Sequence, residues 1–202
     1  MADWDADSRL LRDNLIALLR TVRDQADGRE TLDARVALVW HRQIMDGLKV
    51  PDRRLVGVFR GPPDLPGYEV AVGDLPGVAS VDVPAAVTAF EVTLSRVLEA
   101  LDRRIDARTV PADADALTAV VEFTAWAHAE WVRIHPFANG NGRTARLWAA
   151  AIAMRYGLPP FVRLRPRPDD GYGDACVDAM LGDWRTTIPV FHRMLARSLA
   201  GG

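Results

Sequence analysis

The sequence has few of the features that direct a protein to a nucleic acid or a membrane. Its 202 residues carry 25 basic and 27 acidic side chains, so we expect no nucleic-acid partner and no membrane attachment. No run of about 18 apolar residues is present, and the acidic start MADWDADSR does not resemble a signal peptide. These absences together predict a cytoplasmic protein.

Cysteine and lysine each occur only once in the chain. Cys176 has no partner for an intrachain disulfide or a thiolate metal cluster, which is typical of a reducing compartment. We interpret it as a small packing residue of a helix rather than as a nucleophile. Because Lys49 is the single lysine, the composition favours arginine everywhere, and one arginine alone is weak evidence for a binding site.

Apolar residues at helical spacing predict an all-α bundle over most of the chain. The first such stretch, residues 8–26, follows a possible N-cap at Ser8. We expect one domain over residues 1–202, with N-terminal helices within 1–47 and core helices within 84–199. The segment 114–133 is apolar nearly all round, and the helix that begins near Asn141, with GRTARLWAAAIAMRYG at 142–157, is almost as apolar past its first turn. Both should therefore lie in the middle of the bundle.

Between residues 55 and 72, the helical spacing of apolar residues gives way to short runs that are typical of β-strands. LVGVFRG and YEVAVG are separated by the proline-rich PPDLPG, which predicts a hairpin. A hairpin that only covers the core is the alternative to a functional one.

The loop HPFANGNGR, residues 135–143, joins the two central helices and carries unusual residues for a connector. Gly140 and Gly142 allow positive φ and close approach of another group, and Asn141 can cap the following helix. Such a turn presents N–H groups at the positive end of a helix, which favours an anion. The loop therefore indicates a phosphate site.

Three ionisable side chains surround this turn. Arg143 and Arg146 share one face of the first helical turn and can both reach a bound anion. His135 lies beside the same turn, and its ordinary pKa suits a general base. The alternative is a tight connector with a capping histidine and two surface arginines, but such a connector needs neither the HPF prefix nor paired arginines.

The segment HPFANGNGRTAR, residues 135–146, resembles the signature of the Fic family, His-Pro-Phe-x-(Asp/Glu)-Gly-Asn-Gly-Arg-x-x-Arg. It matches at every fixed position but one. The resemblance extends over about residues 40–195 and includes the preceding helix with His128, the LVGVFRG segment and GYGDACVDAM. It implies an all-α Fic-type bundle with a small β-hairpin flap.

The resemblance implies transfer of AMP from ATP to a Ser, Thr or Tyr hydroxyl of a target protein. His135 would be the catalytic base and Phe137 the buried anchor of the loop. The phosphates would be held by Gly140, Asn141, Gly142, Arg143 and Arg146. The flap would align the target by main-chain pairing, with Val56, Val58 and Phe59 as docking residues, and Tyr172 would lie in the nucleotide pocket. We interpret His128 as a core histidine that supports the loop.

The position that departs from the signature is Asn139, where the family has the Asp or Glu that binds a metal. Mg²⁺ on a nucleotide is usually held by a carboxylate and phosphates, so we expect Mg²⁺ to be used but held weakly. Asn139 could instead mark a phosphate-binding regulatory module that has lost turnover. It could also mark a Fic-type enzyme that transfers another nucleotide or a phosphoryl group.

Many family members carry an inhibitory helix, (Ser/Thr)-x-x-x-Glu-(Gly/Asn), which this chain lacks. SRVLEA at 95–100 and TAVVEF at 118–123 are the nearest segments, and neither ends in Gly or Asn. Control is therefore either absent or supplied by a separate antitoxin-like partner that docks near Arg146.

Overall fold

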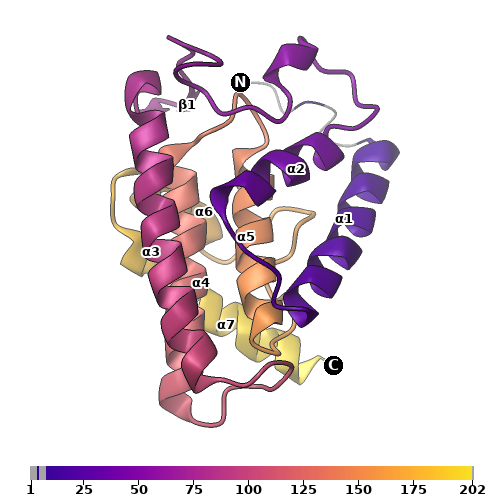
Figure 1. Cartoon of the computed structure of the whole chain (residues 1–202), viewed down its shortest axis with the longest axis vertical. Helices are drawn as coiled ribbons and strands as arrows, with labels where there is room; N and C mark the ends of the chain where they lie inside the picture. Colours follow the sequence, from indigo (N-terminus) through magenta and orange to yellow (C-terminus); the bar gives the residue numbers. More distant parts are fainter. Residues whose placement is uncertain (1–3, 5–7, 202) are drawn as a thin grey trace.

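The protein, seen in a computed structural model that describes Trp4 and residues 8–201, is built mainly of α-helices (Figure 1). The helices of this part of the chain are α1 (Arg9–Asp27), α2 (Ala34–Ile44), α3 (Val83–Arg104), α4 (Ala114–Ile134), α5 (Asn141–Arg155), α6 (Tyr172–Met180) and α7 (Thr187–Ala200). Buried apolar side chains from all of these helices form one contiguous core. The predicted all-α bundle is confirmed.

Helices α4 and α5 run through the middle of the bundle (Figure 1). Nearly every residue of α5 is buried, as the apolar sequence of this helix predicts. The indole Nε1 of Trp131 donates to Thr144 Oγ1 at 2.9 Å, which fixes the end of α4 against the start of α5. Trp131 and Trp148 pack with ring centroids 5.4 Å apart in the core beside this contact. The loop between the two helices is therefore held at both ends.

Helix α1 begins where its cap residue predicts. Ser8 is extended, and its side chain accepts a hydrogen bond from the Leu11 N–H at 3.0 Å. Leu11, Leu15 and Leu18 of α1 are buried, as their helical spacing requires. Apart from Trp4, the first seven residues of the expected N-terminal range lie outside the described residues.

The hairpin lies later in the chain than the range 55–72 predicted for it. The strands are β1 (Ala71–Val72) and β2 (Leu75–Pro76), which pair antiparallel across Gly73 and Asp74. Residues 53–55 form a 3-10 turn, and the following segment has one isolated bridge, Gly61 to Leu65. The prediction failed because the prolines of PPDLPG have no N–H for a ladder and because Phe59 packs into the core.

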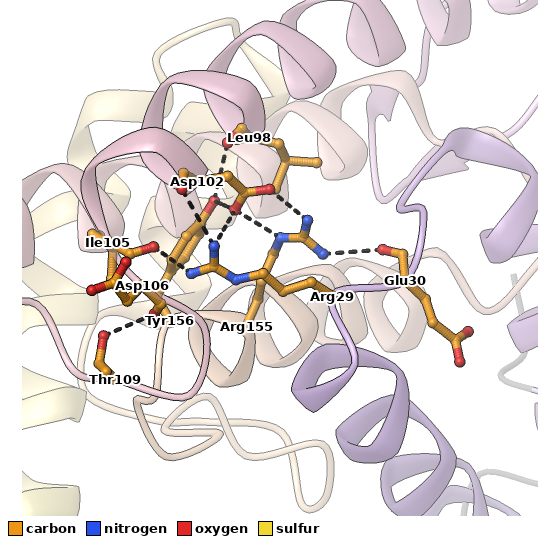
Figure 2. Close-up of polar contacts among 9 residues, drawn as sticks. All are labelled: Arg29, Glu30, Leu98, Asp102, Ile105, Asp106, Thr109, Arg155 and Tyr156. Carbon is orange, nitrogen blue, oxygen red and sulfur yellow. Dashed lines mark hydrogen bonds and ion pairs between the residues drawn. The ribbon is translucent and has the colours of Figure 1, made fainter.

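A polar cluster ties the bundle together at the end of α5 that is remote from the loop (Figure 2). Arg155 contacts both carboxylate oxygens of Asp102 on α3, at 3.2 and 2.6 Å, and donates to the Glu30 carbonyl at 3.0 Å. Tyr156 also donates to Asp102, and Arg29 donates to the Ile105 carbonyl at 2.6 Å. Partial burial opposes ionisation of Asp102, but the hydrogen bonds and charge of Arg155 lower its pKa. The cluster connects three chain segments about 20 Å along α5 from its N-terminus.

Candidate active site

A cavity of about 470 Å³ opens where the hairpin, the loop between α4 and α5, and helix α6 meet. His135, Asn139, Arg143, Arg146 and Tyr172 all line it. The residues Gly140, Asn141 and Gly142 lie in its wall, together with Val70, Ala71, Val72, Gly73 and Leu75 of the hairpin region. The tertiary structure thus brings the residues of the predicted base and phosphate site to one cavity.

His135 follows the last residue of α4 in the left-handed conformation, with φ 53° and ψ 54°. Its Nδ1 lies 2.8 Å from the carbonyl oxygen of Val132. Because a carbonyl only accepts, Nδ1 carries the proton and Nε2 keeps its lone pair. The side chain is half-buried and lines the cavity. His135 therefore offers a basic nitrogen on a half-buried ring of the cavity wall.

The pKa of His135 is lowered from its ordinary value of 6.5, mainly by burial. The hydrogen bond to Val132 opposes this shift, whereas the nearby positive charge of Arg60 adds to it. The imidazole is consequently neutral at neutral pH, which is the form that accepts a proton.

Arg60 holds the backbone around His135 and was not singled out from the sequence. Its side chain is completely buried. It donates to the carbonyls of His135 at 2.6 Å and Ile134 at 3.1 Å, and its own N–H donates to the Pro136 carbonyl at 2.7 Å. In a chain so rich in arginine, no local pattern distinguishes this residue from the exposed ones. Only its contacts reveal it.

Phe137 and Asn141 close the loop from the inside. Phe137 is fully buried and stacks on His41 of α2, with ring centroids 4.2 Å apart. The side-chain amide of Asn141 pairs with the backbone of Phe137, accepting from its N–H and donating to its carbonyl, each at 2.8 Å. Asn141 is therefore not the helix cap that the sequence suggested. An amide offers both a donor and an acceptor, which match the backbone N–H and carbonyl of the single residue Phe137.

The cap of α5 is Gly140, which has φ 81°. A Cβ at this position would lie 2.9 Å from the Met45 side chain, so the site requires glycine for space as well as for conformation. Gly142 differs from the prediction because it is helical and has no positive φ. Its missing side chain instead leaves room beside Arg146, 3.3 Å from where a Cβ would be.

His41 is a second functional-site residue that the sequence did not indicate. It is fully buried, and its Nδ1 accepts from the Gly57 N–H at 2.8 Å. Its Nε2 then donates to the Asn139 carbonyl at 2.9 Å. Burial lowers its pKa to about 4, so it stays neutral and holds both contacts. A lone histidine on an amphipathic helix carries no local signal of this role.

The two predicted arginines are buried on one face of the first turn of α5. Arg143 donates to the side-chain oxygen of Asn139 at 2.7 Å. Arg146 donates to the Leu164 carbonyl at 3.1 Å and to the Tyr172 hydroxyl at 3.3 Å. No side chain among the described residues caps α5, so its first N–H groups and both guanidinium groups lie at one positive helix end. The arrangement suits an anion with several negative charges.

Tyr172, the first residue of α6, connects the arginine to the core. Its hydroxyl lies 2.7 Å from Nε2 of His128, and burial raises the pKa of this hydroxyl. Burial also lowers the pKa of His128 to about 3. Cys176, one turn further along α6, lines the same cavity, and burial raises the pKa of its thiol. A neutral thiol is a poor nucleophile, in agreement with a packing role.

The residues expected to dock a target from the flap, Val56, Val58 and Phe59, do not line the cavity. Phe59 packs on Trp131 and Phe137, with ring centroids 5.9 and 5.1 Å apart. The hairpin of β1 and β2 occupies the position that was predicted for these residues. The physical reason is that Phe59, which is partly buried, packs against the core next to the buried Arg60.

The donor set of the cavity does not fit a tightly held Mg²⁺. The side-chain oxygen of Asn139 already accepts from Arg143, and no Asp or Glu of the described part of the chain lines the cavity. Within residues 8–201 and at Trp4, no three His, Cys, Asp or Glu side chains gather into a possible metal site. Mg²⁺ needs oxygen ligands, usually including a carboxylate.

The fold is a helical bundle in which a histidine and the N-terminus of a central helix line one cavity. The family model described as the Fic/DOC family matches residues 31–153. The chain therefore belongs to the Fic/DOC family. No helix of the part of the chain that the structure describes has the length and apolarity needed to cross a membrane.

The relatives that are similar in sequence include proteins named adenylyltransferases. A protein adenylyltransferase Fic of Nematostella vectensis is 44% identical over 80 residues, which are 39% of this chain and 18% of that protein. The protein adenylyltransferase fic-1 of Caenorhabditis elegans is 43% identical over 68 residues, which are 34% of this chain and 13% of that protein. The matched region thus spans less than a fifth of the length of these relatives.

Solved structures share the fold at low sequence identity. A Fic domain-containing signaling protein from Bacteroides thetaiotaomicron has a TM-score of 0.64 at 21% identity, with 95% of this chain and 70% of that chain covered. The BepC protein of Bartonella tribocorum, crystallised with bound AMPPNP, has a TM-score of 0.61 at 15% identity, with 90% and 86% covered. These similarities support the Fic-type fold.

Proposed function

We propose that the protein is an adenylyltransferase that moves AMP from ATP to a Ser, Thr or Tyr hydroxyl of a target protein. The observation that carries the proposal is the half-buried imidazole of His135, with its unprotonated Nε2, in the same cavity wall as the first turn of α5. The relatives named protein adenylyltransferase support the choice of nucleotide.

The reaction requires one base and one anion-binding site. Nε2 of His135 takes the proton of the acceptor hydroxyl as its oxygen attacks the α-phosphorus of ATP. The bond from the α-phosphorus to the bridging oxygen of the β-phosphate breaks, and pyrophosphate leaves. Arg143, Arg146 and the N-terminal N–H groups of α5 stabilise the charge that develops on it.

The target segment would reach the cavity along the hairpin of β1 and β2. Each strand has two paired residues, and Val72 at the tip is 48% exposed. An extended target segment could add to this edge through main-chain hydrogen bonds, which demand little of its sequence. This role replaces the one expected for Val56, Val58 and Phe59.

Incubation with α-labelled ATP and a lysate tests the proposal. The wild type should label a protein band, and His135→Ala should not, because the acceptor hydroxyl keeps its proton. His192→Ala is the matched control, since this α7 histidine does not line the cavity. Equal labelling by wild type and His135→Ala would show that the assigned base is wrong. Parallel incubations with γ-labelled ATP and with other labelled nucleoside triphosphates identify phosphoryl transfer or another nucleotide.

A second candidate function is a phosphate-binding regulatory module without turnover. The observation that favours it is Asn139, whose oxygen contacts Arg143 in place of a metal. Asn139→Asp separates the two functions, because labelling that appears only in the variant supports the regulatory module.

Regulation by a separate antitoxin-like partner stays a prediction. The segments 95–100 and 118–123 lie within α3 and α4 and do not line the cavity. Glu99 of the first segment is exposed and pairs with Arg103 at 2.6 Å, and Glu122 of the second is exposed. Neither glutamate lies at the cavity with Arg146, so these two segments do not supply inhibition of this kind.

A further inference from the structure

The described part of the cavity wall is strongly positive. Four of its described lining residues are arginines, Arg143 and Arg146 on α5 and Arg165 and Arg167 in the segment before α6. Among residues 8–201 and Trp4, no Asp or Glu lines this cavity. A bound polyphosphate therefore meets cationic side chains from two different chain segments.

Arg143 binds the side-chain oxygen of Asn139, the position where a metal ligand is expected. Its guanidinium group donates to the Asn139 side chain at 2.7 Å, and both residues are buried. A divalent cation bound through this oxygen would have to break that hydrogen bond and then sit beside a guanidinium charge. The pair thus presents an arginine, rather than a cation-binding oxygen, to the phosphate chain.

One aromatic ring contacts an arginine from each of the two segments. The guanidinium carbon of Arg167 lies 5.6 Å from the centre of the Tyr172 ring, and Arg146 donates to the hydroxyl of the same tyrosine at 3.3 Å. Tyr172 is itself fixed by His128 at 2.7 Å. One buried tyrosine therefore contacts guanidinium groups from both chain segments before a ligand arrives.

Planar guanidinium groups bind phosphate oxygens in pairs and carry a charge that does not depend on pH in the neutral range. They can neutralise a triphosphate and its pyrophosphate leaving group, which is the task that a divalent cation performs in other phosphoryl-transfer and nucleotidyl-transfer sites. We propose that this cavity binds the phosphate chain of its donor without a divalent cation, and that Arg165 and Arg167 take part in the binding. This inference rests on the proposed use of a nucleoside triphosphate.

Calorimetric titration with α,β-methylene ATP, which cannot donate AMP, tests the proposal without any turnover. The dissociation constant of the wild type should change by less than about threefold between excess EDTA and excess MgCl₂, because no protein–metal bond contributes. Asn139→Asp places a carboxylate at the cavity. Its affinity should fall in EDTA and recover about tenfold or more with MgCl₂. Gln43→Glu makes the same charge change on the exposed side of α2 and should behave as the wild type.

A separate variant tests whether Arg167 takes part in binding. Arg167→Gln should weaken binding in EDTA about tenfold, the expected loss of one charge-assisted contact to phosphate. Arg20→Gln is the matched control, because Arg20 is exposed on α1 and does not line the cavity. A thermal melt of each variant verifies that it is folded. An unchanged affinity of Arg167→Gln would overturn the role of this arginine.

Two other outcomes separate this inference from the proposed function. Binding by the wild type that requires MgCl₂ overturns metal-free binding and leaves the adenylyltransferase intact. Failure to bind the analogue in either condition overturns both, because the inference depends on a nucleoside triphosphate donor.

Discussion

Replacing Arg60 by methionine should destabilise the protein and disorganise the loop that carries His135. The Arg60 side chain is completely buried and donates to four backbone carbonyls, those of His135, Ile134, Tyr68 and Val78. Methionine fills similar space but has no donor, so these carbonyls lose their partner in a place that water does not reach.

The expected loss is large compared with the stability of a typical domain. A buried acceptor without its donor costs about 1–3 kcal/mol, and contacts in one network are not additive. Removing one partner from a buried charged network typically costs about 3–5 kcal/mol, and we expect a loss of about this size for Arg60→Met. Because the free energy of unfolding of a typical domain is about 5–15 kcal/mol, the variant should remain folded at low temperature but unfold at a lower temperature than the wild type.

Urea unfolding followed by circular dichroism measures this free energy. Arg54→Met is the matched control, because the Arg54 side chain is 86% exposed and pairs only with the neighbouring Asp52, at 2.7 Å. That exposed pair should contribute little to stability, because water and salt screen it. Equal unfolding free energies for Arg60→Met and Arg54→Met would refute the role of Arg60 as the support of the loop.

Three further predictions concern single residues of the site and its support. The acid limb of the labelling rate should have its midpoint below 6.5, because burial lowers the pKa of His135, and a midpoint above 6.5 in a pH profile would contradict this. In the folded protein the pKa of His128 is about 3, whereas in the unfolded chain it is about 6.5. The unfolded chain therefore binds a proton that the folded protein does not, and the unfolding free energy falls as the pH drops from about 6.5 to about 3. His128→Phe should flatten this part of the dependence, measured by urea unfolding at about pH 7 and about pH 5. Gly140→Ala should reduce labelling and stability more than Gly182→Ala. Both glycines have positive φ, but only at Gly140 would a Cβ meet another atom.

The helical architecture and the position of the HPFANGNGR loop between two central helices could be predicted from the sequence, because both depend on local patterns. The apolar periodicity of α1 and the nearly continuous apolar character of α4 and α5 correspond to buried helices in the structure. The residues of the HPFANGNGR loop are consecutive, so their shared position at the start of α5 follows from the chain itself. The location of Arg143 and Arg146 on one helical face follows from the helical repeat.

Other features depended on contacts between distant segments. The hairpin was displaced from 55–72 to 71–76, because local β propensity cannot reveal that Phe59 and Arg60 are needed inside the bundle. The exchange of roles between Asn141 and Gly140 in the loop likewise depends on whether the amide reaches the backbone of Phe137. Hydrogen bonds of this kind have no periodic signature.

The sequence by itself determined the bundle, the order of its central helices and the chemical groups that the loop presents, since helix formation and motif spacing are properties of neighbouring residues. The tertiary structure alone decided which nitrogen of His135 accepts a proton, that Arg60 and His41 support the loop, and that Arg165 and Arg167 join the cavity. Each of these depends on side chains brought together from separate parts of the chain by the burial of the core, which a linear pattern does not encode.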